Sequence, residues 1–102
     1  MAAEVHRDDE QHRYVARVGA EAAGFLQYRE RPNLIALVHT EVDDRFEGQG
    51  VASALAAFAL DDARARGLAV LPFCPFVASY IQRHRDHVDL VPEQYRAAFD
   101  LA

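Results

Sequence analysis

The sequence predicts one mixed α/β (α+β) domain, whose mostly antiparallel sheet has a single parallel β-α-β crossover and flanking helices. Two observations carry this prediction. Up to about residue 42, apolar and polar residues alternate with the period of strands, and turn residues separate the runs. From residue 50 the period becomes helical, and a short apolar run follows. A chain of 102 residues has the length of one domain, so we assign residues 1–102 to a single unit.

The first half of the chain is expected to form an antiparallel meander. Alternating residues predict strands over residues 13–18, 24–28 and 34–42, and a shorter strand is expected near Val5. Short connections between these runs favour neighbouring antiparallel strands. Residues 34–38 are apolar on both faces, which is typical of a central strand that is covered on both sides.

The second half is expected to fold as helix, strand and helix. An Ala- and Leu-rich helix over residues 50–66 stops at Gly67. Its apolar stripe consists of Val51, Leu55, Phe58, Ala59 and Ala63. A strand over residues 68–73 would then run parallel to residues 34–42 through a right-handed crossover. A second helix runs from Pro75 to His84, and final helical turns begin at Pro92.

Composition excludes several classes of protein. The formal net charge is −5 and no Lys/Arg block occurs, which argues against a nucleic-acid partner and against a polybasic membrane anchor. No apolar run approaches the roughly 20 residues that span a membrane. A single cysteine, Cys74, fits a reducing compartment, and the polar N-terminus does not resemble a signal peptide. We therefore expect a cytoplasmic protein, and nothing in the sequence signals an oligomer, so a monomer is favoured.

A glycine-containing turn joins the long strand to the first helix and suits an anion. The first amides of a helix lack internal partners, and the helix dipole adds partial positive charge there. Gly48 and Gly50 allow close approach of a ligand, while Ala52 and Ser53 are small, and Ser53 adds a hydroxyl. Taken alone, such a glycine pair is more often a plain tight turn.

Two segments around this turn carry a resemblance to a known family. Residues 39–55 resemble the cofactor motif of the GNAT N-acetyltransferases. Residues 74–81, Cys-Pro-Phe-Val-Ala-Ser-Tyr-Ile, are similar to a segment of the smallest branch of that superfamily, which lacks the usual N-terminal helices. The resemblance spans residues 24 to about 90. It implies a GNAT-like fold, acetyl-CoA as cosubstrate, and transfer of acetyl to an amine of a small molecule or a protein.

The resemblance also implies which residues contact the cofactor. In that superfamily a Gln/Arg-x-x-Gly-x-Gly/Ala turn binds the CoA pyrophosphate with its amides, and the preceding strand pairs with the pantetheine arm. The implied contacts are Thr40, Val42, Glu47, Gly48, Gln49, Gly50, Val51, Ala52 and Ser53. The family motif can be aligned with this sequence in two registers. In the preferred one, the motif covers Glu47 to Ala52, because that placement is expected to fit the start of the helix better. In the other, it covers Arg45 to Gly50, so that its first position is the basic residue Arg45.

Candidate catalytic groups gather where the parallel strands are expected to diverge. Pro72 inside a strand is tolerated where the ladder ends. Cys74 comes directly before the helix that begins at Pro75. The positive end of that helix is expected to lower the pKa of the Cys74 thiol and so to stabilise its thiolate form. His39 is expected at the same sheet edge, and the two would form a nucleophile–base pair, which the small branch also implies. Glu41 is the alternative base. The plain alternatives are a buried cysteine, an edge histidine and a solvated carboxylate.

Other features keep alternatives open. Many larger GNAT enzymes have a tyrosine acid in the second helix, but that position is Gln82 here, and Tyr80 is out of register. The chain is therefore either an acetyltransferase or a non-catalytic acyl-CoA-binding or sensing module, with a cofactor-free interaction domain as a third possibility. The cluster around His84 and His87 lacks a convincing ligand set, so no metal site is predicted.

Overall fold

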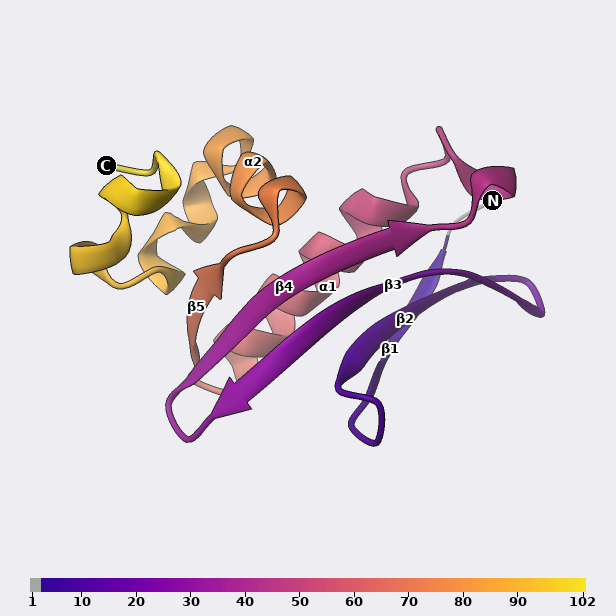
Figure 1. The fold of residues 1–102 in the computed structure, drawn as a ribbon, viewed down its shortest axis with the longest axis horizontal. Helices are drawn as coiled ribbons and strands as arrows, with labels where there is room; N and C mark the ends of the chain where they lie inside the picture. The colour runs from indigo at the N-terminus through magenta and orange to yellow at the C-terminus, as the bar shows by residue number, and fades with distance from the viewer. Residues whose placement is uncertain (1–2) are drawn as a thin grey trace.

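Five strands form one sheet in the order of the chain, β1-β2-β3-β4-β5. The computed structural model describes residues 3–102, with the elements β1 Glu4–Asp8, β2 Arg13–Val18, β3 Glu21–Arg31, β4 Leu34–Val42, α1 Val51–Ala65, β5 Ala69–Pro72 and α2 Pro75–Arg83. Strands β1 to β4 pair antiparallel, and β4 pairs with β5 in parallel (Figure 1). The predicted fold class, with its single parallel crossover, is confirmed.

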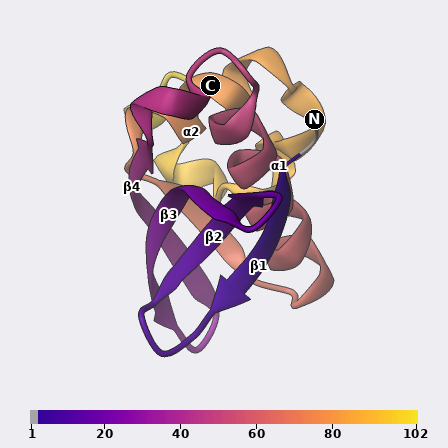
Figure 2. The ribbon, with the colours of Figure 1, turned by 90° about the vertical axis from the view of Figure 1, so that its right-hand side faces the viewer.

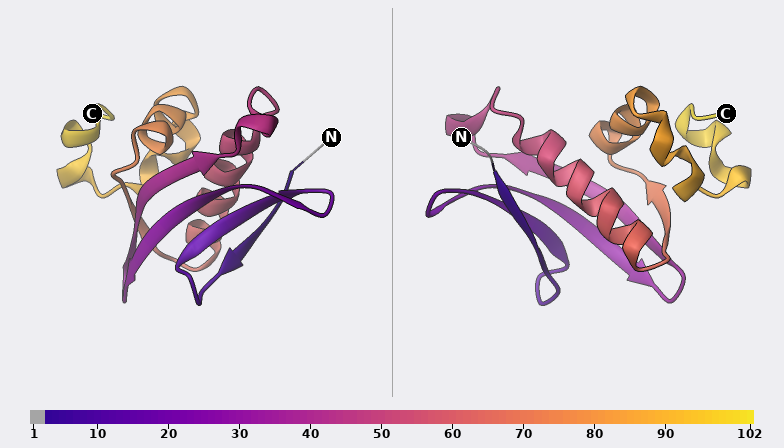
Figure 3. Two further views of the ribbon diagram at one scale, coloured as in Figure 1. Left: turned by 45° about the vertical axis from the view of Figure 1, so that its right-hand side comes forward. Right: turned by 180° about the vertical axis from the view of Figure 1, so that it is seen from behind.

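Helix α1 lies across one face of the sheet, and α2 packs beside it against β5 (Figures 2 and 3). We call the face beneath α1 the inner face and the opposite one the outer face. Within residues 3–102 no helix covers the outer face, so the prediction that the long strand is covered on both sides is wrong for that face. None of the helices in this part of the chain is long and apolar enough to cross a membrane.

The core lies between the inner face and α1. Its fully buried side chains include Tyr14, Leu26, Ile35 and Leu37 from the sheet and Leu55, Ala59, Leu60 and Ala63 from α1. Small alanines on this stripe let the helix approach the sheet closely. Phe58 departs from the predicted stripe, because its side chain is 37% exposed and only its ring edge packs on Tyr14, with centroids 5.8 Å apart.

A bulge in β4 changes which side chains face the core. Gln27 pairs with His39, but the next residue, Tyr28, pairs with Leu37, so Val38 has no partner in the ladder. A bulge inserts one residue and shifts the alternation of faces by one. Without it, His39 would share the inner face with Leu37, whereas with it Thr40 takes that place. A regular strand would place Val38 and Thr40 on one face, but here Val38 is the inserted residue.

The parallel pair ends early, which leaves an open edge on β4. The last pair is Leu37 with Pro72, and the amide of Cys74 then donates to the Leu37 carbonyl at 2.8 Å. Beyond this point β5 turns away toward α2 while β4 continues (Figure 1). The divergence expected from Pro72 is confirmed, and residues 38–42 have no strand beside them on this side within the described chain.

The helical turns predicted after Pro92 are present. They are two 3-10 segments, Glu93–Tyr95 and Ala97–Phe99, after which Asp100 takes a left-handed φ of 56°. Residues Arg85–Leu90 form another 3-10 segment. Asp89 within it is held by Arg64 of α1 through two contacts of 2.8 Å.

Candidate functional site

The turn before α1 holds two glycines in conformations that other residues avoid. Gly48 has a φ of 78°, and so does Gly50, the residue that caps α1. A Cβ added at either position would meet no atom within 4 Å. Backbone conformation, not crowding, therefore requires glycine here, and the surface above the turn is open to a ligand.

Several amides of this turn point at no protein acceptor. Within residues 3–102 the structure gives no partner for the amides of Gly48, Gly50 and residues 51–53. The amide of Glu47 instead donates to the Asp44 carbonyl, and that of Gln49 to the Phe46 carbonyl, both at 3.3 Å. The free amides make a cradle for an anion at the positive end of α1, to which Glu47 and Gln49 contribute no free backbone donor.

The cradle opens into a groove of about 340 Å³. Its walls are formed by Val42, Phe46, Glu47, Gly48, Gly50, Val51, Ala52, Ser53 and Phe76. Because α1 begins at Val51, the register from Arg45 ends on the capping residue Gly50. The helix start therefore gives no reason to prefer the register from Glu47, and that part of the sequence argument does not hold.

Side-chain charges around the cradle are mainly acidic. Arg45, the basic residue of the turn, is paired with Asp43 and with Glu21, each at 3.1 Å. The Arg45 hydrogen bonds lower the pKa of Asp43. Asp44 and Glu47 are exposed nearby. Positive potential at the cradle therefore comes from backbone amides and the helix end rather than from a free cationic side chain.

The open edge of β4 leads into the cradle. Asp43 donates its amide to Ala23 of β3 at 2.8 Å. Successive residues of a strand direct their backbone groups to opposite sides, so Val42 and Thr40 direct theirs away from β3, toward the open edge. The two predicted edge residues thus present unpaired backbone groups in the gap between β4 and α2.

Cys74 lies at the closed end of this gap. It caps α2, with Pro75 as the first helical residue, as predicted. Its side chain is 4% exposed. Sγ shares a hydrogen bond with the Thr40 hydroxyl at 3.1 Å. Sequence reasoning missed Thr40 as a side-chain partner, since only the bulge in β4 brings that hydroxyl to the inner face.

His39 and Glu41 lie on the outer face. His39 Nε2 is 3.7 Å from Glu41 Oε1, and the two side chains are 54% and 63% exposed. The Phe25 ring packs edge-on against His39 with centroids 6.1 Å apart, and the Arg13 guanidinium lies over the Phe25 ring, 4.7 Å from its centroid. The structure therefore brings His39 to Glu41 and not to Cys74, and the expected Cys74–His39 pair does not form.

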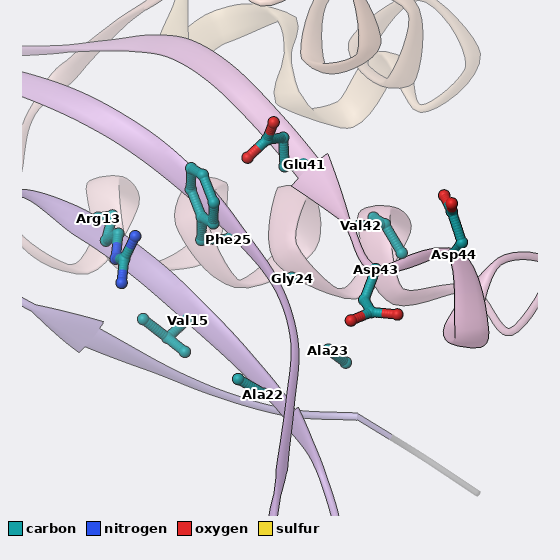
Figure 4. A pocket seen from close by; sticks show the side chains of 10 residues that line it. All are labelled: Arg13, Val15, Ala22, Ala23, Gly24, Phe25, Glu41, Val42, Asp43 and Asp44. Atoms are coloured by element: carbon teal, nitrogen blue, oxygen red, sulfur yellow. The ribbon is translucent and has the colours of Figure 1, made fainter.

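A pocket of about 500 Å³ lies on this outer face, next to Glu41. Figure 4 shows Phe25 and Glu41 projecting to the same side of the sheet, with Asp43 and Asp44 at the far end. The pocket is thus aromatic along one wall and acidic at one end. Arg13 also lines the pocket and lies over the Phe25 ring, so charges of both signs border it.

Residues 13–90 match the sequence model of one protein family, described as GCN5-related N-acetyl-transferase. The chain belongs to this family. The matched part runs from β2 to the 3-10 segment after α2, so it contains the cradle, the open edge and Cys74. Membership places the chain among acyltransferases. A comparison with curated proteins finds no match.

Within this acyltransferase fold, α2 offers no tyrosine at the gap. Gln82 donates its side-chain amide to the Phe99 carbonyl at 3.1 Å, which ties α2 to the C-terminal turns. Tyr80 stacks on His84 with ring centroids 4.1 Å apart. Among residues 3–102 no group of three or more His, Cys, Asp or Glu side chains is arranged to hold a metal ion. At the closed end of the gap, the Thr40 hydroxyl and the Cys74 thiol lie 3.1 Å apart.

Proposed function

We propose that the protein transfers an acetyl group from acetyl-CoA to an amine. The observation that carries this proposal is the open edge of β4, which ends at a cradle of unpartnered amides. The amides of Gly48 and residues 50–53 bind the pyrophosphate. Backbone groups of Thr40 and Val42 pair with the pantetheine arm like an added strand. This pose directs the thioester toward Cys74 at the closed end of the gap.

Replacing Gly50 by Ala is expected to weaken acetyl-CoA binding about tenfold. An L-residue at a φ of 78° costs about 1–2 kcal/mol, and relaxation of that strain turns the cradle amides away from the ligand. Isothermal titration of the wild type and the variant with acetyl-CoA measures the change.

Gly67→Ala is the matched control for that titration. Gly67 has a φ of 68° and open space around its Cβ position, but it lies at the other end of α1. It carries the same backbone penalty without touching the cradle, so its affinity should equal that of the wild type. Equal losses in both variants, or no binding by the wild type at millimolar acetyl-CoA, would contradict the proposed function.

Replacing Glu47 by Gln is expected to tighten acetyl-CoA binding up to about fivefold at low salt, because the change removes an exposed anion beside the pyrophosphate. Raising the ionic strength should shrink the gain, since salt screens exposed charges. Dissociation constants at two salt concentrations test this. Glu93→Gln removes an equally exposed carboxylate far from the cradle and should change nothing.

A second candidate function is that of a non-catalytic acyl-CoA-binding module. The observation that favours it is the placement of Cys74, which is buried, hydrogen-bonded to Thr40 and separated from His39. Gln82, at the position where many larger GNAT enzymes have a tyrosine acid, also favours a binding module. Release of free CoA thiol in the presence of a broad amine panel separates the two functions: an acetyltransferase releases it, whereas a binding module retains acetyl-CoA intact.

A further inference from the structure

We infer that the amine acceptor carries an apolar group, such as an aromatic ring, close to its nitrogen. This group packs on Phe73 and Phe99, which we call the aromatic rim, at the closed end of the gap. The two rings meet edge to face, with centroids 5.5 Å apart. The inference rests on the proposed function and specifies the class of its second substrate.

Phe73 lies at the point where β4 and β5 separate. The last pair of the ladder is Leu37 with Pro72, and the amide of Cys74 still donates to the Leu37 carbonyl at 2.8 Å. Phe73 stands between these two anchored residues, and its own amide donates back to the Leu71 carbonyl at 3.1 Å. Its backbone is therefore held beside the thiol toward which the proposed pose directs the thioester.

The Phe73 ring and the Cys74 thiol lie in opposite environments, although the two residues are adjacent in the chain. The Cys74 side chain is 4% exposed and its Sγ is 3.1 Å from the Thr40 hydroxyl, whereas Phe73 is 57% exposed. The thiol side of the closed end is thus filled by protein, and the ring side is open to solvent. An acceptor that reaches the thioester from solvent passes the Phe73 ring.

The aromatic rim is a fixed surface rather than one loose side chain. Among residues 3–102, Phe73 is the most exposed of the large apolar side chains at the surface, ahead of Tyr95 and Phe58. Its ring edge is supported by Phe99, in the geometry that aromatic pairs favour. Phe99 is held in turn, because its carbonyl accepts a hydrogen bond of 3.1 Å from the Gln82 side chain.

The β4 side of the closed end is also apolar. Val38, the residue after Leu37, is partly buried, and the first carboxylate beyond it on β4 is Glu41, which lies 3.7 Å from His39 on the outer face. Asp100 follows Phe99 and is exposed, so it is the one carboxylate next to the aromatic rim in the sequence. An apolar substituent is bound here with less loss of hydration than a second charged group would suffer.

These positions define the chemistry of the acceptor. The amine nitrogen forms a bond to the thioester carbonyl carbon at the closed end, and the C–S bond breaks with its electron pair on the CoA sulfur. That sulfur takes up one proton, and the amine gives up its protons to solvent. An arylalkylamine then places its ring against Phe73. A lysine flanked by apolar residues in a peptide offers the same chemistry from a second source.

Initial rates with matched amines test the preference. We expect kcat/KM with 2-phenylethylamine to exceed that with 2-aminoethanol, an amine of similar basicity, by about tenfold or more, because the ring buries apolar area in the transition state. It should also exceed that with 1,4-diaminobutane. A short peptide with lysine between two leucines tests the second source, and its use ahead of 2-phenylethylamine would identify a polypeptide acceptor of the same chemistry.

Variants of Phe73 test the contact itself. Phe73→Ala should lower the ratio of kcat/KM for 2-phenylethylamine to that for 2-aminoethanol about tenfold, and Phe73→Leu should keep most of the ratio. Phe73→Glu should shift the preference toward 1,4-diaminobutane, because a carboxylate attracts its second ammonium group. Phe58→Ala is the matched control, a partly exposed phenylalanine of α1 that packs on Tyr14, and it should keep the wild-type ratio.

A wild-type preference for 2-aminoethanol or for the diamine overturns the inference and leaves the proposed function standing. An unchanged ratio in Phe73→Ala also overturns it, as does a ratio that responds to Asp100→Asn and not to Phe73→Ala, since charge would then select the acceptor. Thermal unfolding of each variant shows that the fold is kept. Failure to acetylate any of these amines or the peptide overturns the proposed function and this inference together.

Discussion

Replacing Gly24 by Ala is expected to lower the free energy of unfolding by about 3 kcal/mol or more. A Cβ at this position would lie 2.5 Å from the carbonyl oxygen of Glu41 and 3.2 Å from the Cα of Val42. Both are backbone atoms of the paired strand β4, so neither can move aside as a flexible side chain would. The added methyl group must instead push β3 and β4 apart. Urea denaturation measures the loss.

The same substitution should also weaken acetyl-CoA binding, because the strand that moves carries Val42 and leads into the cradle. The third neighbour of the added Cβ, Val51 Cγ1 at 3.3 Å, belongs to the first turn of α1. Ala22→Val is the matched control on the same strand, since Ala22 is exposed, and it should change stability by less than about 0.5 kcal/mol. A Gly24→Ala variant as stable as the wild type would mean that β3 and β4 separate at little cost.

Replacing Asp62 by Asn is expected to lower the free energy of unfolding by about 2–4 kcal/mol at neutral pH. Asp62 accepts a hydrogen bond of 2.7 Å from the hydroxyl of Tyr14, whose side chain is fully buried. It also accepts from Arg7 at 3.0 Å and from Arg66 at 3.2 Å. This carboxylate thus ties α1 to β1 and β2. An amide removes the charge that the two arginines share.

The loss from Asp62→Asn should shrink in acid. Burial raises the pKa of Asp62, but the hydrogen bonds from Tyr14 and Arg7 outweigh it, so the pKa lies below its usual range in the folded protein. A lowered folded pKa gives stability that is present above the unfolded value, near 3.8, and is lost as the pH falls through the folded value. The difference between wild type and variant should therefore begin to shrink below about pH 4 and vanish only below the lowered folded pKa.

Denaturation at neutral and acidic pH, with Asp61→Asn as control, checks this dependence. Asp61 is the adjacent residue of α1 but is exposed, so its replacement should cost less than about 0.5 kcal/mol at either pH. A difference between Asp62→Asn and wild type that stays constant in acid would contradict the account of the carboxylate. Tyr14 and Arg7 lie 48 and 55 residues from Asp62 in the sequence, so these contacts arise only in the folded chain.

The sequence by itself determined the order and type of the principal elements and the position of the cradle. The change from a strand period to a helical period fixed the start of α1 to within one residue, and Pro72 marked the end of the parallel pair. These signals are local, because side-chain periodicity, turn glycines and helix starts depend on a few neighbouring residues. The helical turns after Pro92 were predicted from the same kind of local signal, and the structure has them as two 3-10 segments.

Only the tertiary structure decided which groups meet in the site. A regular alternation would place Val38 and Thr40 on one face. The pairing of β3 with β4 instead inserts Val38 as a bulge, keeps His39 off the core face and brings Thr40 to Cys74. A bulge depends on the register between strands, and no residue of β4 encodes that register alone. The close approach of Gly24 to the β4 backbone likewise depends on the register between β3 and β4. The sequence therefore supplies the candidate side chains, and strand pairing decides which face of β4 each of them occupies.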